Sequence, residues 1–295
     1  MNNNNCLFCQ SKNIKTFKTK DYNRFTDELN FTFCYCFSCN CVSNLSKSID
    51  LNIYYNNPLS PYDIDDYNYN KITNKNKYFL KLIKKFISKG KILEIGPGFG
   101  YLSKLLNDEK YLITIIEQDK ELCDFYRKKL QIYNVKNADI INFKMDNQKY
   151  NAIIAFQVFE HLDNPNKWIK NISKALDDNG YLFLSTPNSK SIQFKIMKNW
   201  WPHLDAPRHQ MIYSSSSLEK FLNNYKLVKI YESWGIDTIL WNLFGWNNFF
   251  RTIFNIKKNN IITKLLGYFF FTIFFFIEII PGFGASYIHV YKKTN

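Results

Sequence analysis

The stretch 91–100, KILEIGPGFG, constrains the fold of this chain more than any other segment. A short apolar run at 92–95 predicts a buried strand, and it opens into Gly96, Gly98 and Gly100. Glycine lets the backbone turn sharply and leaves no Cβ in the way of a ligand, while the helix expected to follow offers unpaired N–H groups. The sequence therefore predicts a site for a nucleotide-like ligand at this turn.

Two acidic residues accompany the glycines. Glu94 precedes them, and the spacing G-x-G-x-G differs from the G-x-G-x-x-G used to approach a pyrophosphate. Glu117 ends a second expected strand at 111–117, about twenty residues further on, where doubly wound folds place a carboxylate on a ribose hydroxyl. This spacing alone does not separate a nicotinamide dinucleotide from other adenosine ligands.

Strands and helices are expected to alternate through the middle of the chain. The expected strands are 91–95, 111–117, 135–140, 151–156 and 181–185, and the expected helices are 99–108, 120–133 and 165–177. This order predicts an α/β fold with a doubly wound parallel sheet, whose ligands bind at the carboxyl ends of the strands. Asp139 and Gln157 stand at two such strand ends and are candidate ligand contacts.

Four segments in this order, ILEIGPGFG, Glu117, YNAIIAFQVFEHL and YLFLSTPN, resemble the class I S-adenosylmethionine-dependent methyltransferases. Within that class the chain is similar to the group that includes ubiquinone-biosynthesis-type O-methyltransferases, over roughly residues 77–234. The resemblance implies a seven-stranded Rossmann-like sheet, S-adenosylmethionine as cofactor, and closing strands at 227–233 and 286–292. It also implies methyl transfer to a small-molecule, glycan or lipid-linked acceptor, with oxygen as the expected target.

The resemblance also assigns roles to single residues. Glu94 would hold the methionine end of the cofactor or the glycine loop, Glu117 the ribose, and Asp139 the adenine amino group. A hydroxyl acceptor must lose its proton, and a neutral imidazole suits that task at physiological pH. His161 is the first candidate base and His209 the second. The alternative for His161 is that it only orients the loop after its strand.

The seven cysteines point to a reducing compartment. Their number is odd, and the start MNNNNCLFC has no apolar leader, so we expect a cytoplasmic protein with metal-bound or free thiols. Six of the seven lie before residue 50, as two Cys-x-x-Cys knuckles, Cys6 with Cys9 and Cys36 with Cys39, and two further thiols, Cys34 and Cys41. Two such pairs predict a closed, structural zinc site of the ribbon type. Cys34 or Cys41 could replace one of these ligands, and Gln10 and Asn40 stand where glycine usually follows each pair.

The segment 199–209, NWWPHLDAPRH, is the expected acceptor region. It gathers aromatic rings, histidines and a guanidinium, and Trp201, His203 and Arg208 are the candidate acceptor contacts. The alternative for the tryptophans is packing against the core. The resembling enzymes carry a comparable segment in a substrate lid.

An apolar insertion separates the last two expected strands. Residues 236–254 and 261–280 are rich in aromatic residues, but the uninterrupted run 265–277 is shorter than the ~20 residues that span a bilayer. A single span would also keep the last two strands from pairing in one sheet. We therefore expect a helical hairpin at 236–280 that packs on the domain, forms a homodimer or dips into the inner face of a membrane, with Lys257, Lys258 and Lys264 near lipid phosphates.

The net charge of +14 favours anionic partners, although lysine is abundant throughout the chain. A zinc-ribbon nucleic-acid-binding protein or RNA methyltransferase is the alternative function. The sequence disfavours it, because it lacks an aromatic-basic stripe and an N-P-P-[YF] motif. The expected segments are 1–50 (zinc-ribbon-like), 51–76 (linker and cofactor-side lid), 77–235 (cofactor-binding core), 236–284 (apolar hairpin) and 285–295 (final strand).

Overall fold

The computed structural model describes residues 5–46, 49–55, 73–139, 143, 148–234, 236–256 and 260–294. They form two compact units, each assembled from separate parts of the chain. Unit 1 contains residues 1–60, 186–218 and 233–287, and unit 2 contains residues 61–185, 219–232 and 288–295. Most of the expected linker 51–76 lies outside the described residues.

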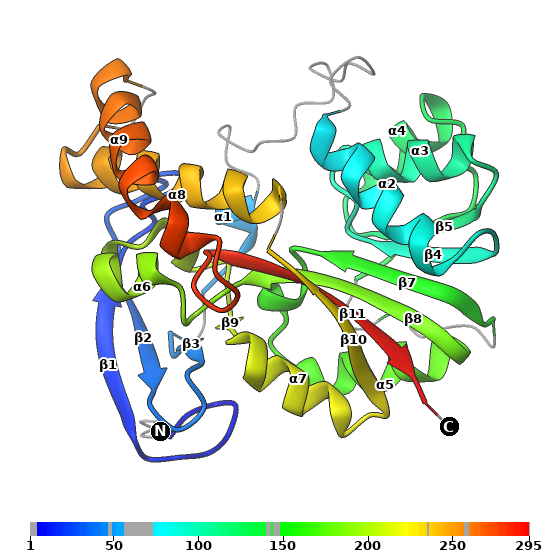
Figure 1. Ribbon diagram of the computed structural model, residues 1–295, viewed down its shortest axis with the longest axis horizontal. Coiled ribbons are helices and arrows are strands. Elements are labelled where there is room, and N and C mark those ends of the chain that lie inside the picture. Colours follow the sequence, from blue (N-terminus) through cyan, green and yellow to red (C-terminus); the bar gives the residue numbers. More distant parts are fainter. Residues whose placement is uncertain are drawn as a thin grey trace. The chain divides into compact units, whose positions relative to one another are not determined.

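Unit 2 is built on a seven-stranded sheet with the order β10-β11-β8-β7-β4-β5-β6 (Figure 1). The strands are β4 (Lys91–Ile95), β5 (Leu112–Glu117), β6 (Val135–Asn137), β7 (Tyr150–Phe156), β8 (Leu176–Pro187), β10 (Leu227–Ser233) and β11 (Ser286–Lys293). Parallel pairs join β6 to β5, β5 to β4, β4 to β7 and β7 to β8. The sheet confirms the expected Rossmann-like fold, and β10 and β11 are neighbours in it.

Helices cover both faces of this sheet. The helices before and between its strands are α2 (Asn74–Phe86), α3 (Tyr101–Asp108), α4 (Lys120–Lys128), α5 (Pro165–Ala175) and α7 (Ser215–Asn223). One apolar cluster joins α2, α3 and α4 to one face of the sheet, and α5 lies on the other face in Figure 1. The strands read as nearly continuous apolar runs because a parallel sheet is buried on both sides.

The largest differences between the element boundaries and the sequence-based expectations lie at three places. The helix expected at 120–133 ends at Lys128, and Gln131 just beyond it has a left-handed φ of 57°. The weak strand expected at 135–140 ends at Asn137. The strand expected at 181–185 begins earlier, because Leu176 already pairs with Tyr150.

Unit 1 contains a four-stranded antiparallel sheet with the order β1-β2-β3-β9. Its elements are β1 (Ile14–Thr19), β2 (Phe31–Cys36), β3 (Val42–Asn44), α1 (Asn52–Tyr55), α6 (Ile192–Met197), β9 (Met211–Ile212), α8 (Ile236–Ile253) and α9 (Ile261–Glu278). Short 3₁₀ helices lie at Lys198–Trp200 and Pro202–Leu204. β9 follows the expected acceptor segment and pairs with β3, so that segment belongs to the same unit as the cysteines.

Candidate functional site

The glycine loop after β4 adopts the conformation that its composition predicts. Gly96, Gly98 and Gly100 have φ values of 60°, 59° and 68°, in the left-handed region that favours glycine. Gly100 is the residue before α3, and a Cβ there would lie 2.7 Å from Leu130 Cδ1. A side chain at Gly100 would therefore clash, and glycine at the three left-handed positions leaves no Cβ in the way of a ligand.

Glu94 supports the loop from within the unit. Its side chain is buried and accepts a hydrogen bond from the Ser103 hydroxyl on α3. Burial raises the pKa of the Glu94 carboxyl to about 7. Of its two expected roles, this position favours holding the glycine loop.

Tyr126 is a residue that sequence reasoning missed. It lies on α4, and its hydroxyl donates a hydrogen bond to the carbonyl oxygen of Gly98. The same ring would lie 3.1 Å from a Cβ at Gly100. Nothing in the local sequence marks this tyrosine, because its contact depends on the packing of α4 beside the loop.

Glu117 ends β5 next to the glycine loop. The N–H of Gly96 donates to the carbonyl oxygen of Ile116 at 3.0 Å, which ties the two strand ends together. The Glu117 side chain is 7% exposed, and its Oε1 accepts a hydrogen bond from the Asp119 N–H at 3.0 Å. Burial raises its pKa, against the backbone hydrogen bonds that lower it. A carboxyl group at this place can accept hydrogen bonds from the two hydroxyls of a ribose.

Asp139 lies just beyond β6, at the same edge of the sheet. β6 pairs with β5 so that Asn137 is opposite Glu117, and Asp139 follows two residues later. Its side chain is exposed. The expected contact with an adenine amino group is compatible with this position and stays a prediction.

The loop after β7 holds two further candidates. β4 and β7 are the neighbours at which the strand order reverses, which is where doubly wound folds bind ligands. Gln157 has a left-handed φ of 56°, and its side-chain amide donates to the Ser185 hydroxyl at 3.1 Å. His161 is half-buried at the end of the 3₁₀ helix Phe159–His161. Both residues stand at the edge where the glycine loop lies.

The candidate acceptor residues of unit 1 are almost fully buried. Trp201 and His203 are 1% and 2% exposed and pack edge-to-face, with ring centroids 5.1 Å apart. His203 Nε2 donates to the carbonyl oxygen of Trp241 at 3.0 Å, and burial lowers its pKa to about 4. These contacts favour core packing for Trp201, which was the alternative for the tryptophans, whereas Trp200 is 46% exposed.

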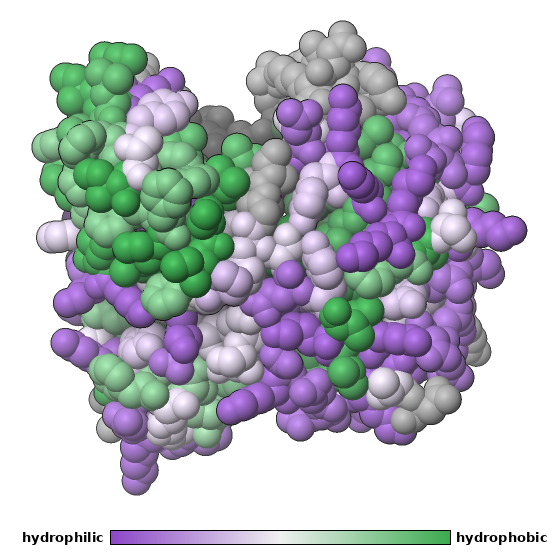
Figure 2. Space-filling model, in the orientation of Figure 1, coloured by the Kyte–Doolittle hydropathy of each residue, from purple (hydrophilic) through white to green (hydrophobic). Residues whose placement is uncertain are grey.

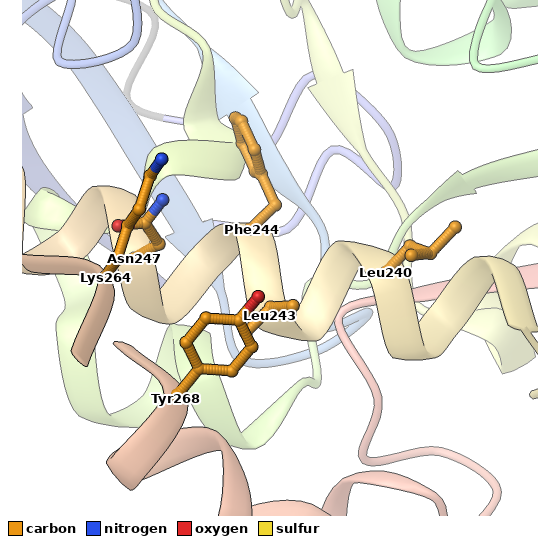
Figure 3. A pocket seen from close by; sticks show the side chains of 6 residues that line it. All are labelled: Leu240, Leu243, Phe244, Asn247, Lys264 and Tyr268. Atoms are coloured by element: carbon orange, nitrogen blue, oxygen red, sulfur yellow. The ribbon is translucent and has the colours of Figure 1, made fainter. Parts of the chain in front are cut away.

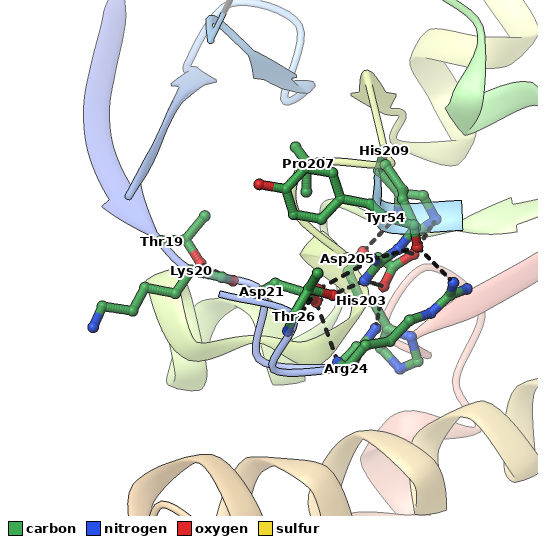
Figure 4. Close-up of polar contacts among 12 residues, drawn as sticks. Thr19, Lys20, Asp21, Arg24, Thr26, Tyr54, His203, Asp205, Pro207 and His209 are labelled. Carbon is green, nitrogen blue, oxygen red and sulfur yellow. Dashed lines mark hydrogen bonds and ion pairs between the residues drawn. The ribbon is translucent and has the colours of Figure 1, made fainter. Parts of the chain in front are cut away.

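Arg208 is held by two carboxylates inside unit 1. Its Nη2 lies 2.7 Å from both Asp21 Oδ1 and Asp205 Oδ1, and its Nε lies 2.9 Å from Asp205 Oδ2. Figure 4 shows the contacts of Asp21 and Asp205 within this network. Burial would raise the pKa of Asp205, but the guanidinium holds it well below its usual range. The arrangement favours a structural role for Arg208 over the expected contact with an acceptor.

The orientation of the His209 ring follows from one hydrogen bond. Nδ1 lies 2.9 Å from the carbonyl oxygen of His203, and a carbonyl only accepts, so Nδ1 carries a hydrogen. Nε2 is then the nitrogen that can take up a proton, and it lies 3.8 Å from Asp205 Oδ2. The ring is therefore fixed in the tautomer that a general base needs.

Four thiols form the predicted metal centre. The Sγ atoms of Cys6, Cys9, Cys36 and Cys39 lie within 4.8 Å of one another, with Cys6 to Cys39 at 3.7 Å and Cys9 to Cys36 at 3.6 Å. A tetrahedron of sulfurs around zinc, at the usual Zn–S length of about 2.3 Å, has edges of about 3.8 Å. The thiols therefore offer a closed tetrahedral zinc site, and this set does not include Cys34.

The second knuckle is fastened to the segment after β8. The hydroxyls of Ser214 and Ser217 donate to the carbonyl oxygen of Cys39, and the Ser189 hydroxyl donates to that of Asn40. Asn40 itself has a left-handed φ of 56°, at the place where glycine was expected. The second knuckle is thus held by serines that are far from it in sequence.

Comparisons with known proteins agree on one family. The family profile described as a methyltransferase domain matches residues 67–231, more than half of the chain. The ubiquinone biosynthesis O-methyltransferase of Coxiella burnetii is 32% identical over 116 residues, which cover 37% of this chain and 49% of that enzyme. The ribosomal RNA small subunit methyltransferase A of Malacoplasma penetrans is 31% identical over 71 residues, with coverage of 24% and 25%.

The chain thus spans about half the length of the first of these curated relatives and a quarter of the second. Among solved structures, a candidate sarcosine dimethylglycine methyltransferase from Galdieria sulphuraria has a TM-score of 0.54 at 12% identity. The superposition covers 75% of this chain and 85% of that one. At this identity the likeness concerns the fold alone.

Proposed function

Because the chain belongs to the class I S-adenosylmethionine-dependent methyltransferases, we propose that it methylates an oxygen of a small-molecule, glycan or lipid-linked acceptor. The observation that carries the choice of oxygen is the match to ubiquinone biosynthesis O-methyltransferases. Two features support an adenosine cofactor: the left-handed glycines bring no Cβ toward a ligand, and Glu117 offers a carboxyl group for the ribose.

S-adenosylmethionine supplies a methyl group on a sulfonium, which is already reactive. The chain then has to align the acceptor, exclude water and remove a proton. His161 is the proposed base in unit 2, because it follows β7 at the switch point of the sheet. His209 is the second proposed base, because its Nδ1–H is already committed to a carbonyl. Buried Trp201, His203 and Arg208 position the segment that carries His209.

Calorimetric titration tests the cofactor half of this proposal. We expect S-adenosylmethionine and S-adenosylhomocysteine to bind, NAD not to bind, and Glu117→Gln to weaken binding by about tenfold or more through the lost charge-assisted hydrogen bond. Glu121→Gln is the matched control, since Glu121 is exposed in the first turn of α4. Binding of NAD in place of the adenosyl ligands would contradict the proposal.

The acceptor half needs a transfer assay. Labelled S-adenosylmethionine is incubated with the protein and with catechols, sugar nucleotides or polyprenyl-linked glycans, and the labelled atom is identified by mass spectrometry. Asparagine in place of the base should lower kcat by about a hundredfold or more without weakening cofactor binding. His161→Asn and His209→Asn therefore decide which histidine acts.

RNA remains the second candidate acceptor, because one relative is a ribosomal RNA methyltransferase. The same assay includes ribosomal RNA. If the labelled methyl group appeared in RNA and in none of the hydroxylated compounds, RNA would be the acceptor and the small-molecule or glycan acceptor proposed above would be wrong.

A further inference from the structure

The hairpin of α8 and α9 buries several polar residues and exposes a long apolar stripe. On α9 the buried residues are Thr263, Gly267 and Glu278. The exposed stripe includes Leu265, Phe269, Ile273 and Phe276, which follow one another at helical spacing. Only 17% of this 18-residue helix is buried, and its length and composition would suffice to cross a membrane. Figure 2 shows the hydrophobic side chains gathered over this hairpin.

α8 also buries polar residues, beside the core residues Trp246 and Phe250, and exposes apolar ones. Thr238 and Asn242 are fully buried and bind the backbone at Ser286 and Ala285, at 3.0 and 2.8 Å. Leu240 and Phe244 are exposed on the same helix. A helix on the surface of a water-soluble domain normally turns its apolar side inward.

The seam between the helices is close and combines aromatic with polar contacts, since Trp246 stacks on Phe274 with ring centroids 4.9 Å apart. The Trp246 indole N–H donates to Glu278 Oε1 at 2.9 Å, within the buried side of the hairpin. A Cβ on Gly267 would lie 2.8 Å from Asn247 Cα, so the two backbones approach closely there. Small residues at the contact and polar side chains turned inward are the features of helices that face hydrocarbon.

We propose that the α8–α9 hairpin lies in the acyl layer of an anionic phospholipid membrane. Hydrocarbon can cover a helix that is exposed around most of its circumference, whereas a second copy of the chain would cover one side of it. An anionic leaflet also suits the net charge of +14. The inference concerns membrane binding alone and does not depend on the acceptor proposed above.

The fold limits how deeply the hairpin enters. β10 and β11 are neighbours in one sheet, so both ends of the hairpin lie on the same side of a membrane. α8 is also held to unit 1, since its Trp246 and Phe250 belong to that core and its Trp241 carbonyl binds His203. The hairpin therefore lies along one leaflet and does not cross.

A hollow between the helices offers a place for part of one lipid. Its volume is about 270 Å³, and Leu240, Leu243, Phe244, Asn247, Lys264 and Tyr268 line it (Figure 3). Within the described part of the chain, Asn247 Oδ1 is buried without a hydrogen-bond partner. The exposed Lys264 can bind a headgroup phosphate, a headgroup hydroxyl can donate to Asn247, and the leucines and Phe244 can contact the acyl chain. Lys257 and Lys258, expected near phosphates, lie outside the described residues.

Co-sedimentation of the full chain with vesicles tests the proposal, without cofactor or acceptor. We expect binding to mixed phosphatidylcholine and phosphatidylglycerol, and about a hundredfold weaker binding of the Phe269→Glu, Phe276→Glu double variant. The matched control is Leu29→Glu with Tyr133→Glu, which adds the same charge at residues that are 60% and 76% exposed outside the hairpin. It should bind within about threefold of the wild type.

Lys264→Gln should bind these vesicles about fivefold more weakly and pure phosphatidylcholine unchanged. Wild-type protein that stays in the supernatant would overturn the proposal. An equal loss of vesicle binding in the hairpin double variant and in its control double variant would overturn it as well. Light scattering without vesicles measures whether the protein is a monomer or a dimer. A dimer that Phe269→Glu with Phe276→Glu converts to monomers would assign this face to a second copy of the chain.

Discussion

Different kinds of contact stabilise unit 1 and unit 2 internally. In unit 2 the residues that build the ligand edge follow their strands directly, as Gly96 follows β4 and Gln157 follows β7. In unit 1 the deciding contacts join distant segments, as Arg208 binds Asp21 and Ser217 binds Cys39. Local patterns in the sequence therefore describe unit 2 well, while unit 1 depends on contacts that no short pattern records.

The units also bury charge differently. Unit 2 buries Glu94 with one hydroxyl partner, so its pKa rises. Unit 1 buries Arg208 between two carboxylates, and the pKa of Asp205 falls. A paired buried charge is costly to break, whereas a lone buried carboxyl responds chiefly to pH. Four predictions follow this contrast, from the largest effect to the smallest.

Removal of a zinc ligand should produce the largest difference between the two units in their stability. Zinc binding to four thiolates contributes about 10 kcal/mol or more to the folding of small metal domains. We expect Cys39→Ser to lose zinc and to unfold unit 1, while unit 2 still binds S-adenosylmethionine. Metal analysis and thermal unfolding measure both effects. Cys34→Ser is the control, since Cys34 lies outside the four-thiol set and should leave one zinc per chain. A Cys39→Ser protein that melts like the wild type would show that the metal does not hold unit 1.

Breaking the buried ion network should come next. Arg208→Met leaves Asp21 and Asp205 buried without their cation, and we expect a loss of about 3–5 kcal/mol in urea denaturation. Lys84→Met removes a cation from an exposed pair with Glu109 and should cost less than about 1 kcal/mol. If Arg208→Met cost no more than this control, the network would not be what holds the segments of unit 1 together.

The sequence predicted unit 2 nearly completely for a physical reason. Buried parallel strands need continuous apolar runs, and left-handed turns need glycine, so β4, β5, β7 and the glycine loop each leave a local trace. The metal ligands also leave a local trace in the sequence, because they form two Cys-x-x-Cys pairs. The choice against Cys34 leaves no such trace, because Cys34 and Cys36 lie two residues apart on one face of β2, and only the tertiary placement of Cys6 and Cys9 selects Cys36.

Burial of the acceptor segment was not predictable in the same way. Tryptophan, histidine and arginine suit both a substrate site and a polar core, and only the pairing of β9 with β3 shows that this segment packs inside unit 1. The carboxylate partners of Arg208 are Asp205, three residues before it, and the distant Asp21. Asp21 has no sequence signal, because its role arises from tertiary contact.

Opposite pH responses should distinguish two buried groups. The Glu94 pKa rises from 4.5 to about 7, so between these values the native state binds the proton that the unfolded chain has lost. Its contribution to stability therefore falls as the pH rises through 7. The His203 pKa falls from 6.5 to about 4, so the unfolded chain binds the extra proton, and stability falls as the pH drops through this range.

Each shift corresponds to at most about 3 kcal/mol. Urea denaturation of the wild type, Glu94→Gln and His203→Gln between pH 4 and 8 measures the two slopes. The stability of the wild type relative to Glu94→Gln should fall with rising pH, and its stability relative to His203→Gln should fall with falling pH. Parallel slopes for the two variants would contradict the contrast between the units.

A pair of glycine substitutions should give the smallest effect and the sharpest comparison. Gly282 in unit 1 has a φ of 93° and open space around its missing Cβ, so Gly282→Ala should cost only the conformational strain, about 1 kcal/mol. Gly100 in unit 2 has a φ of 68° and would also bring a Cβ within 2.7 Å of Leu130, so Gly100→Ala should cost about 2 kcal/mol and weaken S-adenosylmethionine binding. Equal losses at the two positions, with unchanged cofactor affinity, would mean that the loop after β4 tolerates a side chain and that its glycines serve the turn alone. A larger loss at Gly100 that appears in affinity as well as stability would tie the close packing of α3 and α4 to the ligand edge of unit 2.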